Sequence, residues 1–221
     1  MTEQEILSRV DHTLLKATAS WEEIKNLCDE AVRYKTATVC IPPAYVRRVF
    51  AEYGKDPVIC TVAGFPLGYN VTAAKILEAG AAISDGAAEI DMVINIGDVK
   101  NGRFNDVLNE ILVVKKICGD KILKVIVETC CLTEDEKIRL CGIVTEAGAD
   151  FIKTSTGFGA AGAAVDDIKL FRQHIGGGVK IKAAGGIKTR DDLENFIRAG
   201  ADRLGTSSAV KLLSGIAAAG Y

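Results

Sequence analysis

The chain has 221 residues, of which 48% are hydrophobic and 25% are charged. Its 27 basic and 29 acidic residues leave a formal net charge of −2, so the composition offers no basic surface for nucleic acid. The same figures exclude an intrinsically disordered chain, which combines low hydrophobicity with high net charge. They predict one or two globular domains with a sizeable core.

Residues 1–8 contain two acidic side chains and lack the basic and apolar regions of a secretory signal. Nowhere do 18 consecutive apolar residues occur, so we expect no membrane span and a cytoplasmic location. The 7 cysteines are an odd number without a Cys-x-x-Cys pair, and His12 lies far from His174. We therefore expect reduced thiols and no metal site.

Eight apolar segments rich in β-branched residues predict strands. In chain order they cover residues 10–15, 37–41, 58–63, 89–95, 122–128, 150–154, 179–183 and 202–205. Helical patterns separate most of them, and three of these begin with capping signals. The signals are Ser20 with Glu23, Thr133 with Glu136, and Thr189 with Asp191 and Asp192.

Strands that alternate with helices predict a parallel sheet, and eight such units favour a closed (β/α)8 TIM barrel over an open sheet. Residues 146–154 resemble residues 198–206, and each copy runs from a helix end through Ala-Gly-Ala-Asp into a strand. No linker interrupts the pattern, so we expect a single barrel domain over residues 1–221 with a short extra helix at residues 1–8. About 28 residues per unit is near the lower limit of this fold, which leaves little room for a lid.

Charged residues stand on the predicted strands toward the ends where barrel enzymes carry their chemistry. They are Asp91, Lys124, Glu128, Lys153 and Lys182. Lys153 and Lys182 end consecutive strands about 5 Å apart, where two ammonium groups repel by about 3 kcal/mol at an effective dielectric constant of about 20. This repulsion favours a free amine, the species that forms Schiff bases with carbonyls. Two solvated strand-end charges are the alternative interpretation.

Glycine-rich turns follow the last three predicted strands, where barrels of this class commonly hold phosphate. The candidate phosphate-binding residues are Gly157, Gly185, Gly186, Gly205, Ser207 and Ser208. Ordinary turn geometry is the alternative for each glycine. The run from Gly157 to Gly162 matches the dinucleotide pattern G-x-G-x-x-G, but residues 168–190 contain no acidic residue to hold a ribose. We therefore do not expect a nicotinamide site.

Three further positions are left open by their sequence context. His12 follows Asp11 on the first predicted strand and is either a core histidine or a group that orients the barrel mouth. Cys130 and Cys131 lack a neighbouring histidine, so they give little support to a thiolate nucleophile.

These motifs resemble, in their order along nearly the whole chain, the deoxyribose-phosphate aldolases, a family of class I aldolases. The matching segments are residues 11–15, 39–40, 64–68, 89–97, 123–129, 151–158, 182–186 and 205–208. The resemblance implies a TIM barrel that reversibly cleaves 2-deoxy-D-ribose 5-phosphate to acetaldehyde and D-glyceraldehyde 3-phosphate. It also implies that neither a metal nor an organic cofactor takes part, and that the chain forms a homo-oligomer, a dimer or tetramer.

The resemblance assigns roles to individual residues. Lys153 matches the Schiff-base lysine, Lys182 the second lysine that keeps it deprotonated, and Asp91 the acid of the proton relay. Lys124, Cys40 and Thr156 match supporting positions, and the candidate phosphate-binding residues match phosphate contacts. An aldolase for another phosphorylated sugar, or a barrel that binds sugar phosphates without turnover, would use the same motifs.

Several positions depart from the family pattern. They are Ala17, Pro42, Ala184 and Lys188, where proline, asparagine, serine and arginine are common, and Lys180, where small residues are common. Lysine at position 188 provides a point charge in place of a bidentate fork, so phosphate affinity is expected to differ. Tyr221 at the end of the chain either reaches the site with its hydroxyl or belongs to a frayed tail.

Overall fold

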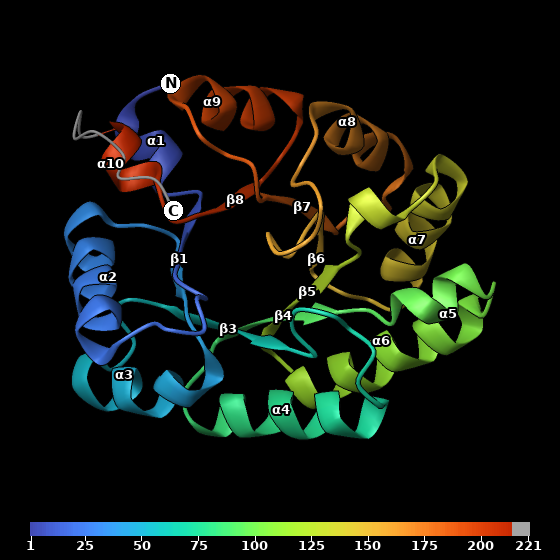
Figure 1. Cartoon of the computed structure of the whole chain (residues 1–221), viewed down its shortest axis with the longest axis horizontal. Helices are drawn as coiled ribbons and strands as arrows, with labels where there is room; N and C mark the ends of the chain where they lie inside the picture. The colour runs from blue at the N-terminus through green and yellow to red at the C-terminus, as the bar shows by residue number, and fades with distance from the viewer. Residues whose placement is uncertain (214–221) are drawn as a thin grey trace.

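A computed structural model describes residues 1–213. Eight parallel strands form a closed barrel in chain order, which confirms the predicted TIM barrel (Figure 1). The strands are β1 (Val10–Thr13), β2 (Thr38–Cys40), β3 (Ile59–Ala63), β4 (Glu89–Val93), β5 (Ile122–Ile126), β6 (Phe151–Lys153), β7 (Lys180–Ala184) and β8 (Arg203–Thr206).

Helices surround the barrel on the outside (Figure 1). They are α1 (Glu3–Leu7), α2 (Trp21–Tyr34), α3 (Val46–Tyr53), α4 (Thr72–Ser84), α5 (Ile96–Lys100), α6 (Phe104–Cys118), α7 (Glu134–Glu146), α8 (Val165–His174), α9 (Arg190–Ala199) and α10 (Ala209–Leu213). Two short 3-10 helices, η1 (Pro43–Tyr45) and η2 (Thr129–Cys131), follow strands β2 and β5. Helix α1 confirms the short extra helix that was predicted before the first strand.

The predicted capping signals begin three of these helices. In α2 the Ser20 side chain accepts a hydrogen bond from the Glu23 N–H, and the Glu23 side chain accepts one from the Ser20 N–H. The same reciprocal box begins α7 at Thr133 and α9 at Thr189. Each box satisfies two backbone donors that the first helical turn leaves without partners. Local sequence therefore fixes where these helices begin.

All eight predicted strands are present, and several predictions extended too far at the carboxyl end. Ile94 and Val127 are fully buried although β4 ends at Val93 and β5 ends at Ile126. Burial thus continues into the loops beyond regular pairing, and an apolar pattern alone does not mark where a strand ends. These loops leave the barrel at the end that carries the candidate site.

The two faces of the strands have different characters. Residues such as Ile90, Met92 and Val125 are fully buried in the large apolar cluster that includes residues of the surrounding helices. The alternating residues that face the barrel interior include Asp91, Lys124 and Lys182, which are also fully buried. Barrel interiors are usually filled by branched apolar side chains, so a charged interior indicates a site rather than a packing core.

Candidate active site

The charged side chains of the barrel interior come from six strands. They are Asp11 on β1, Glu89 and Asp91 on β4, Lys124 on β5, Lys153 on β6, Lys182 on β7 and Arg203 on β8. Strand pairing places Asp91 beside Lys124 and Lys153 beside Lys182. The structure therefore brings together four of the five charged residues that the sequence singled out, all except Glu128, and adds Asp11, Glu89 and Arg203.

Asp91 is the centre of this cluster. Its Oδ2 atom lies 2.7 Å from Lys153 Nζ and 2.7 Å from Lys182 Nζ, while Oδ1 accepts from Lys124 Nζ at 2.8 Å. Burial alone would raise the pKa of Asp91, but the ammonium groups of Lys124, Lys153 and Lys182 together hold it well below its usual value. Asp91 is therefore an ionised carboxylate that joins the two lysines of the predicted pair.

The surroundings of Lys153 and Lys182 differ from the sequence prediction. Direct repulsion was expected to favour a free amine on one of them, but the Asp91 carboxylate contacts both ammonium groups. Burial alone would lower the pKa of Lys182, yet Asp11 and Asp91 raise it above its ordinary value. Lys182 is thus held as an ammonium ion. The sequence interpretation relied on repulsion between the two cations, and the Asp91 carboxylate that contacts both of them opposes this repulsion.

Asp11 is a member of the cluster that the sequence interpretation missed. Its carboxylate contacts Lys182 Nζ at 2.5 Å, Arg203 at 2.6 Å and Lys124 Nζ at 3.4 Å. Side-chain alternation along β1 carries the signal, because Asp11 faces the interior while His12 points to the helix side. There His12 Nε2 lies 2.7 Å from the Glu30 carboxylate on α2. His12 therefore belongs to the packing between strand and helix.

A second acidic residue of β4, Glu89, contacts Lys124. Glu89 lies 2.6 Å from Lys124 Nζ and 3.3 Å from Arg203. Burial alone would lower the pKa of Lys124, but Asp11 and Asp91 raise it well above its ordinary value. Lys124 is consequently held as a fixed ammonium beneath Asp91. Lys180, which shares a face with Lys182 in the sequence pattern, is exposed, with Nζ 5.7 Å from the centre of the Phe151 ring.

The ion pairs distinguish Lys153 from the other two lysines. With every member ionised, the four cations and three anions of the interior carry one excess positive charge. Lys124 and Lys182 each contact at least two carboxylates, whereas Asp91 is the acid that contacts Lys153 among residues 1–213. Lys153 is therefore the lysine of this cluster that the fewest ion pairs hold.

Two buried cysteines complete the wall beside Asp91. Cys60 Sγ lies 3.2 Å from Asp91 Oδ1 and 3.1 Å from Lys124 Nζ. A hydrogen bond with Cys60 lowers the pKa of Cys40, and burial raises the pKa of Cys60 well above its ordinary value. Cys40, Cys60 and Asp91 place donor atoms within 4.8 Å of one another, a spacing that a metal ion could use. The Lys124 ammonium group already contacts two of these donors, Cys60 Sγ and Asp91 Oδ1.

Glycine backbones meet at the predicted phosphate loops after β6 and β7. A Cβ atom on Gly162 would lie 2.3 Å from the Gly185 carbonyl carbon, and one on Gly185 would lie 3.3 Å from Gly157 Cα. The Ala163 N–H donates to Ala184 O and to Gly185 O, which fixes the two loops to each other. This close approach explains the G-x-G-x-x-G match without a dinucleotide, because these glycines let two loops pack together.

The remaining predicted phosphate residues lie on or after β8. Gly205 is inside the strand, where a Cβ would lie 2.9 Å from Lys182 Cε, so it makes room for the lysine rather than forming a loop. Ser207 and Ser208 follow the strand, and the Ser208 hydroxyl donates to Ile187 O in the loop after β7. Ser208 therefore connects the loop after β8 to the loop after β7.

Thr156 is held by Glu128, a strand-end acid to which the sequence interpretation gave no role. Glu128 Oε2 accepts from the Thr156 N–H at 3.2 Å and from its hydroxyl at 2.5 Å. Glu128 is buried and adopts a φ of 57°, in the left-handed region that favours glycine. The Thr156 hydroxyl in turn accepts from the Phe158 N–H. Glu128 thus orders the loop that follows Lys153.

The departures from the family pattern lie around this site rather than in the cluster. Ala184 is the last residue of β7, Pro42 precedes η1, and Ala17 and Lys188 are exposed. The Lys188 N–H donates to Asp192 at the start of α9. Tyr221 lies outside the described residues.

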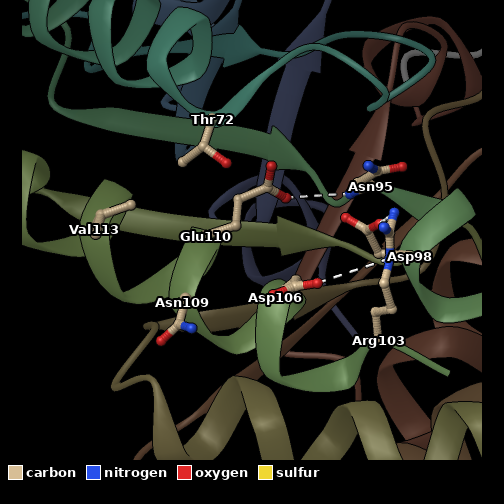
Figure 2. A pocket seen from close by; sticks show the side chains of 8 residues that line it. All are labelled: Thr72, Asn95, Asp98, Arg103, Asp106, Asn109, Glu110 and Val113. Carbon is tan, nitrogen blue, oxygen red and sulfur yellow. Dashed lines mark hydrogen bonds and ion pairs between the residues drawn. The ribbon is translucent and has the colours of Figure 1, made fainter.

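A separate hollow of about 430 Å³ lies on the outside of the barrel near α4, α5 and α6 (Figure 2). Its lining contains none of the clustered lysines. Arg103, its cation, contacts Asp98 and Asp106, and the Glu110 carboxylate accepts from the Asn95 N–H. The hollow is therefore acidic and its arginine is already paired, so it does not provide a phosphate site.

No helix within residues 1–213 is both long enough and apolar enough to cross a membrane.

Fold and site together define a (β/α)8 barrel with buried lysines in its interior: Lys153 ends β6, and Lys124 and Lys182 lie in the middle of β5 and β7. Residues 6–218 match the DeoC/LacD family of aldolases. The chain is 60% identical over 221 residues, all of both chains, to the deoxyribose-phosphate aldolase of Clostridium botulinum (strain Eklund 17B / Type B). It is 60% identical over 209 residues to that of Clostridioides difficile (strain 630), covering 94% of this chain and 95% of the relative.

Solved structures agree with the sequence relatives. The aldolase QR15 superposes with a TM-score of 0.91 at 36% identity, covering 96% of this chain and 95% of that one. A deoxyribose phosphate aldolase from Aeropyrum pernix, described as a unique tetrameric structure, gives 0.90 at 31% identity, covering 97% and 92%. The chain belongs to the DeoC/LacD aldolase family.

Proposed function

We propose that this chain catalyses the reversible aldol cleavage of 2-deoxy-D-ribose 5-phosphate to acetaldehyde and D-glyceraldehyde 3-phosphate, with Lys153 as the Schiff-base residue. The observation that carries the proposal is the Asp91 carboxylate, which lies 2.7 Å from both Lys153 Nζ and Lys182 Nζ inside the barrel. Relatives at 60% identity that carry the name deoxyribose-phosphate aldolase support the choice of substrate.

The reaction begins at the Lys153 amine. The neutral amine adds to the C1 aldehyde of the open-chain sugar, and loss of water gives an iminium ion. The C2–C3 bond then breaks, its electron pair passes to C2 as an enamine, and the C3 hydroxyl gives up its proton. Protonation at C2 and hydrolysis release acetaldehyde and restore Lys153. Atoms and electrons balance over these reaction steps without a redox cofactor.

Asp91 and Lys182 are proposed to move the protons. Asp91 accepts the proton from Lys153 or passes it to Lys182, because its Oδ2 atom contacts both lysines. Lys182 stays an ammonium ion beside Asp11, so it returns protons rather than competing as a nucleophile. Lys124 holds the other oxygen of Asp91, and Cys40 is buried close to Asp91.

Phosphate binding is proposed for the glycine loops at the barrel mouth. Gly157, Gly185 and Gly186 have φ values between 75° and 88°, which side chains rarely adopt, and backbone N–H groups in such turns can surround an anion. Ser207 and Ser208 add hydroxyl groups beside them. Holding the phosphate end of the substrate would place its aldehyde at Lys153.

Assembly and location follow the family. We infer a homo-oligomer of single-domain chains in the cytoplasm, where free cysteines remain reduced. Leu77 on α4 and Val113 and Ile117 on neighbouring α6 are exposed apolar side chains, and the Aeropyrum pernix relative is described as a tetramer. Light scattering coupled to size-exclusion chromatography tests the assembly, and a monomer would contradict it.

Borohydride reduction in the presence of 2-deoxyribose 5-phosphate tests the residue and the reaction class together. We expect a reduced adduct on Lys153 by peptide mapping, with no adduct and no turnover in Lys153→Leu. Lys180→Leu, which removes an exposed lysine from the foot of β7, is the matched control and should trap normally. An adduct on another lysine contradicts the assignment. Thermal stabilisation by sugar phosphates without any adduct would indicate a binding protein instead.

A further inference from the structure

The thiols of Cys130 and Cys131 have no role in the proposed aldol reaction. Both lie in η2, both are exposed, and their Sγ atoms are 4.0 Å apart. The other cysteines are buried, namely Cys28, Cys40, Cys60, Cys118 and Cys141. Cys130 and Cys131 are therefore the two thiols that a solute can reach directly.

The distance between the two sulfur atoms allows both to bind one soft metal or metalloid centre. A tetrahedral centre with sulfur bonds of about 2.3 Å holds two sulfur atoms about 3.8 Å apart, and a pyramidal centre such as trivalent arsenic holds them somewhat closer. The observed separation is 4.0 Å, so little movement is needed. Burial and the neighbouring Cys130 raise the pKa of Cys131, so the Cys131 proton leaves as a centre binds rather than beforehand. Thiolate sulfur prefers soft, thiophilic ions over hard ones.

We propose that Cys130 and Cys131 form a dithiol site that binds one thiophilic metal or metalloid, such as trivalent arsenic, and that its occupation disturbs the loop at residues 156–159. With an aryl arsenoxide, two S–As bonds form, the As=O bond breaks, and the two thiol protons leave with the oxygen as one water. The oxidation state of arsenic and sulfur does not change.

Glu128 connects Cys130 to the loop at residues 156–159. The Cys130 thiol donates to Glu128 Oε1 at 3.9 Å, and the same carboxylate accepts both hydrogen bonds from Thr156. The loop also packs directly on the sulfur, because a Cβ at Gly159 would lie 3.1 Å from Cys130 Sγ. Binding at Cys130 removes the donor to Glu128 and adds an atom where Gly159 already makes close contact.

The functional effect rests on the proposed function. Thr156 is next to Gly157, which is proposed to contact the substrate phosphate, and the loop begins after Lys153. Displacement of residues 156–159 should therefore weaken binding of a phosphorylated substrate more than it slows the chemical step. We expect a severalfold rise in KM for 2-deoxyribose 5-phosphate, and little change in kcat/KM for unphosphorylated 2-deoxyribose.

Phenylarsine oxide tests the site on the full chain. Intact-mass analysis should show one phenylarsenic adduct per chain, thiol titration should show the loss of two thiols, and 2,3-dimercaptopropanol should reverse both. These readings do not depend on turnover, so they distinguish failure of this site from failure of the aldolase assignment. No adduct on the wild-type chain overturns the site.

Cys131→Ser is the matched control, because it breaks the pair and leaves Cys130, Cys40 and Cys60 in place. This variant should keep its basal activity, form no stable adduct and show no arsenical effect on KM. A stable adduct that persists in Cys131→Ser together with lost activity would place the arsenical at Cys40 and Cys60 and overturn the proposal. An adduct on the wild-type chain with an unchanged KM overturns the coupling through Glu128.

Discussion

The carboxylate of Asp11 on β1 contacts the ammonium group of Lys182 on β7 at 2.5 Å, although these strands are not neighbours in the barrel. Both side chains are fully buried, and 171 positions separate them in the chain. Closure of the barrel therefore supplies the anion that keeps the second lysine charged. An acid on the first strand thus determines the protonation of a group proposed to act on the substrate.

Replacing Asp11 with asparagine should move the alkaline limit of activity to lower pH. Asp11 raises the pKa of Lys182, and without it the effect of burial, which lowers this pKa, is less opposed. Lys182 would then lose its proton nearer to neutral pH, so kcat should fall as pH rises in a range where the wild-type enzyme is unaffected. A kcat profile between about pH 6 and pH 10 measures this shift.

The control for this variant is Asp29→Asn, which changes a carboxylate at an exposed ion pair with Lys25. Asp29→Asn should leave the pH profile unchanged, because an exposed ion pair contributes about 0–1 kcal/mol and Asp29 lies on helix α2, outside the barrel interior. Asp11→Asn should also lower the free energy of unfolding by about 3–5 kcal/mol, since it leaves buried cations with fewer partners. An alkaline limit identical to that of the wild type would contradict the role given to Asp11.

Gly205→Ala should reduce kcat by about tenfold or more, because the added methyl group would meet Lys182 Cε at 2.9 Å and a small displacement of a catalytic group is costly. Gly142→Ala on α7 is the control, since a Cβ there meets nothing within 4 Å. It should retain activity and gain about 0.5–1 kcal/mol of stability. Comparable kcat values for the two variants would show that Lys182 does not need this space.

Gly162→Ala should raise KM for 2-deoxyribose 5-phosphate by about tenfold or more, because its methyl group would lie 2.3 Å from the Gly185 carbonyl carbon and force the two loops apart. Activity on unphosphorylated 2-deoxyribose should change much less. Gly177→Ala, where a Cβ meets nothing within 4 Å, should leave both substrates unaffected. Equal losses on both substrates would instead indicate general damage to the barrel.

Sequence patterns predicted the strands, the helix starts and the residues Asp91, Lys124, Lys153 and Lys182, because each has a local signature. Alternation along one strand decides which face a side chain takes, and a capping box decides where a helix begins. Alternation along β1 places Asp11 inside the barrel, but the sequence does not reveal its partner Lys182, which lies on a strand that becomes close only when the barrel closes. For the same reason the sequence interpretation could not weigh lysine repulsion against the carboxylates that contact each lysine, since these come from different strands.

A second buried ion pair has no sequence signature, because its lysine stands in an ordinary helical pattern. Lys75 on α4 lies 2.7 Å from Glu110 on α6, and it also donates to Val93 O at the end of β4. Glu110 accepts from the Asn95 N–H, so the pair fixes the strand end that follows Asp91. Burial raises the pKa of Glu110 and lowers the pKa of Lys75, so each charge depends on its partner.

Lys75→Met should therefore destabilise the fold by about 3–5 kcal/mol at neutral pH, because it leaves a buried carboxylate without its cation. A carboxyl with a raised pKa in the folded state stabilises at low pH and loses that contribution as pH rises through its folded pKa. The loss in Lys75→Met should thus be larger at about pH 8 than at about pH 5. Urea unfolding at both pH values and one protein concentration measures it. The double variant Lys75→Met with Glu110→Leu should recover part of the stability and lose this pH dependence, since no buried charge remains; a pH dependence that persists in the double variant would assign it to another group.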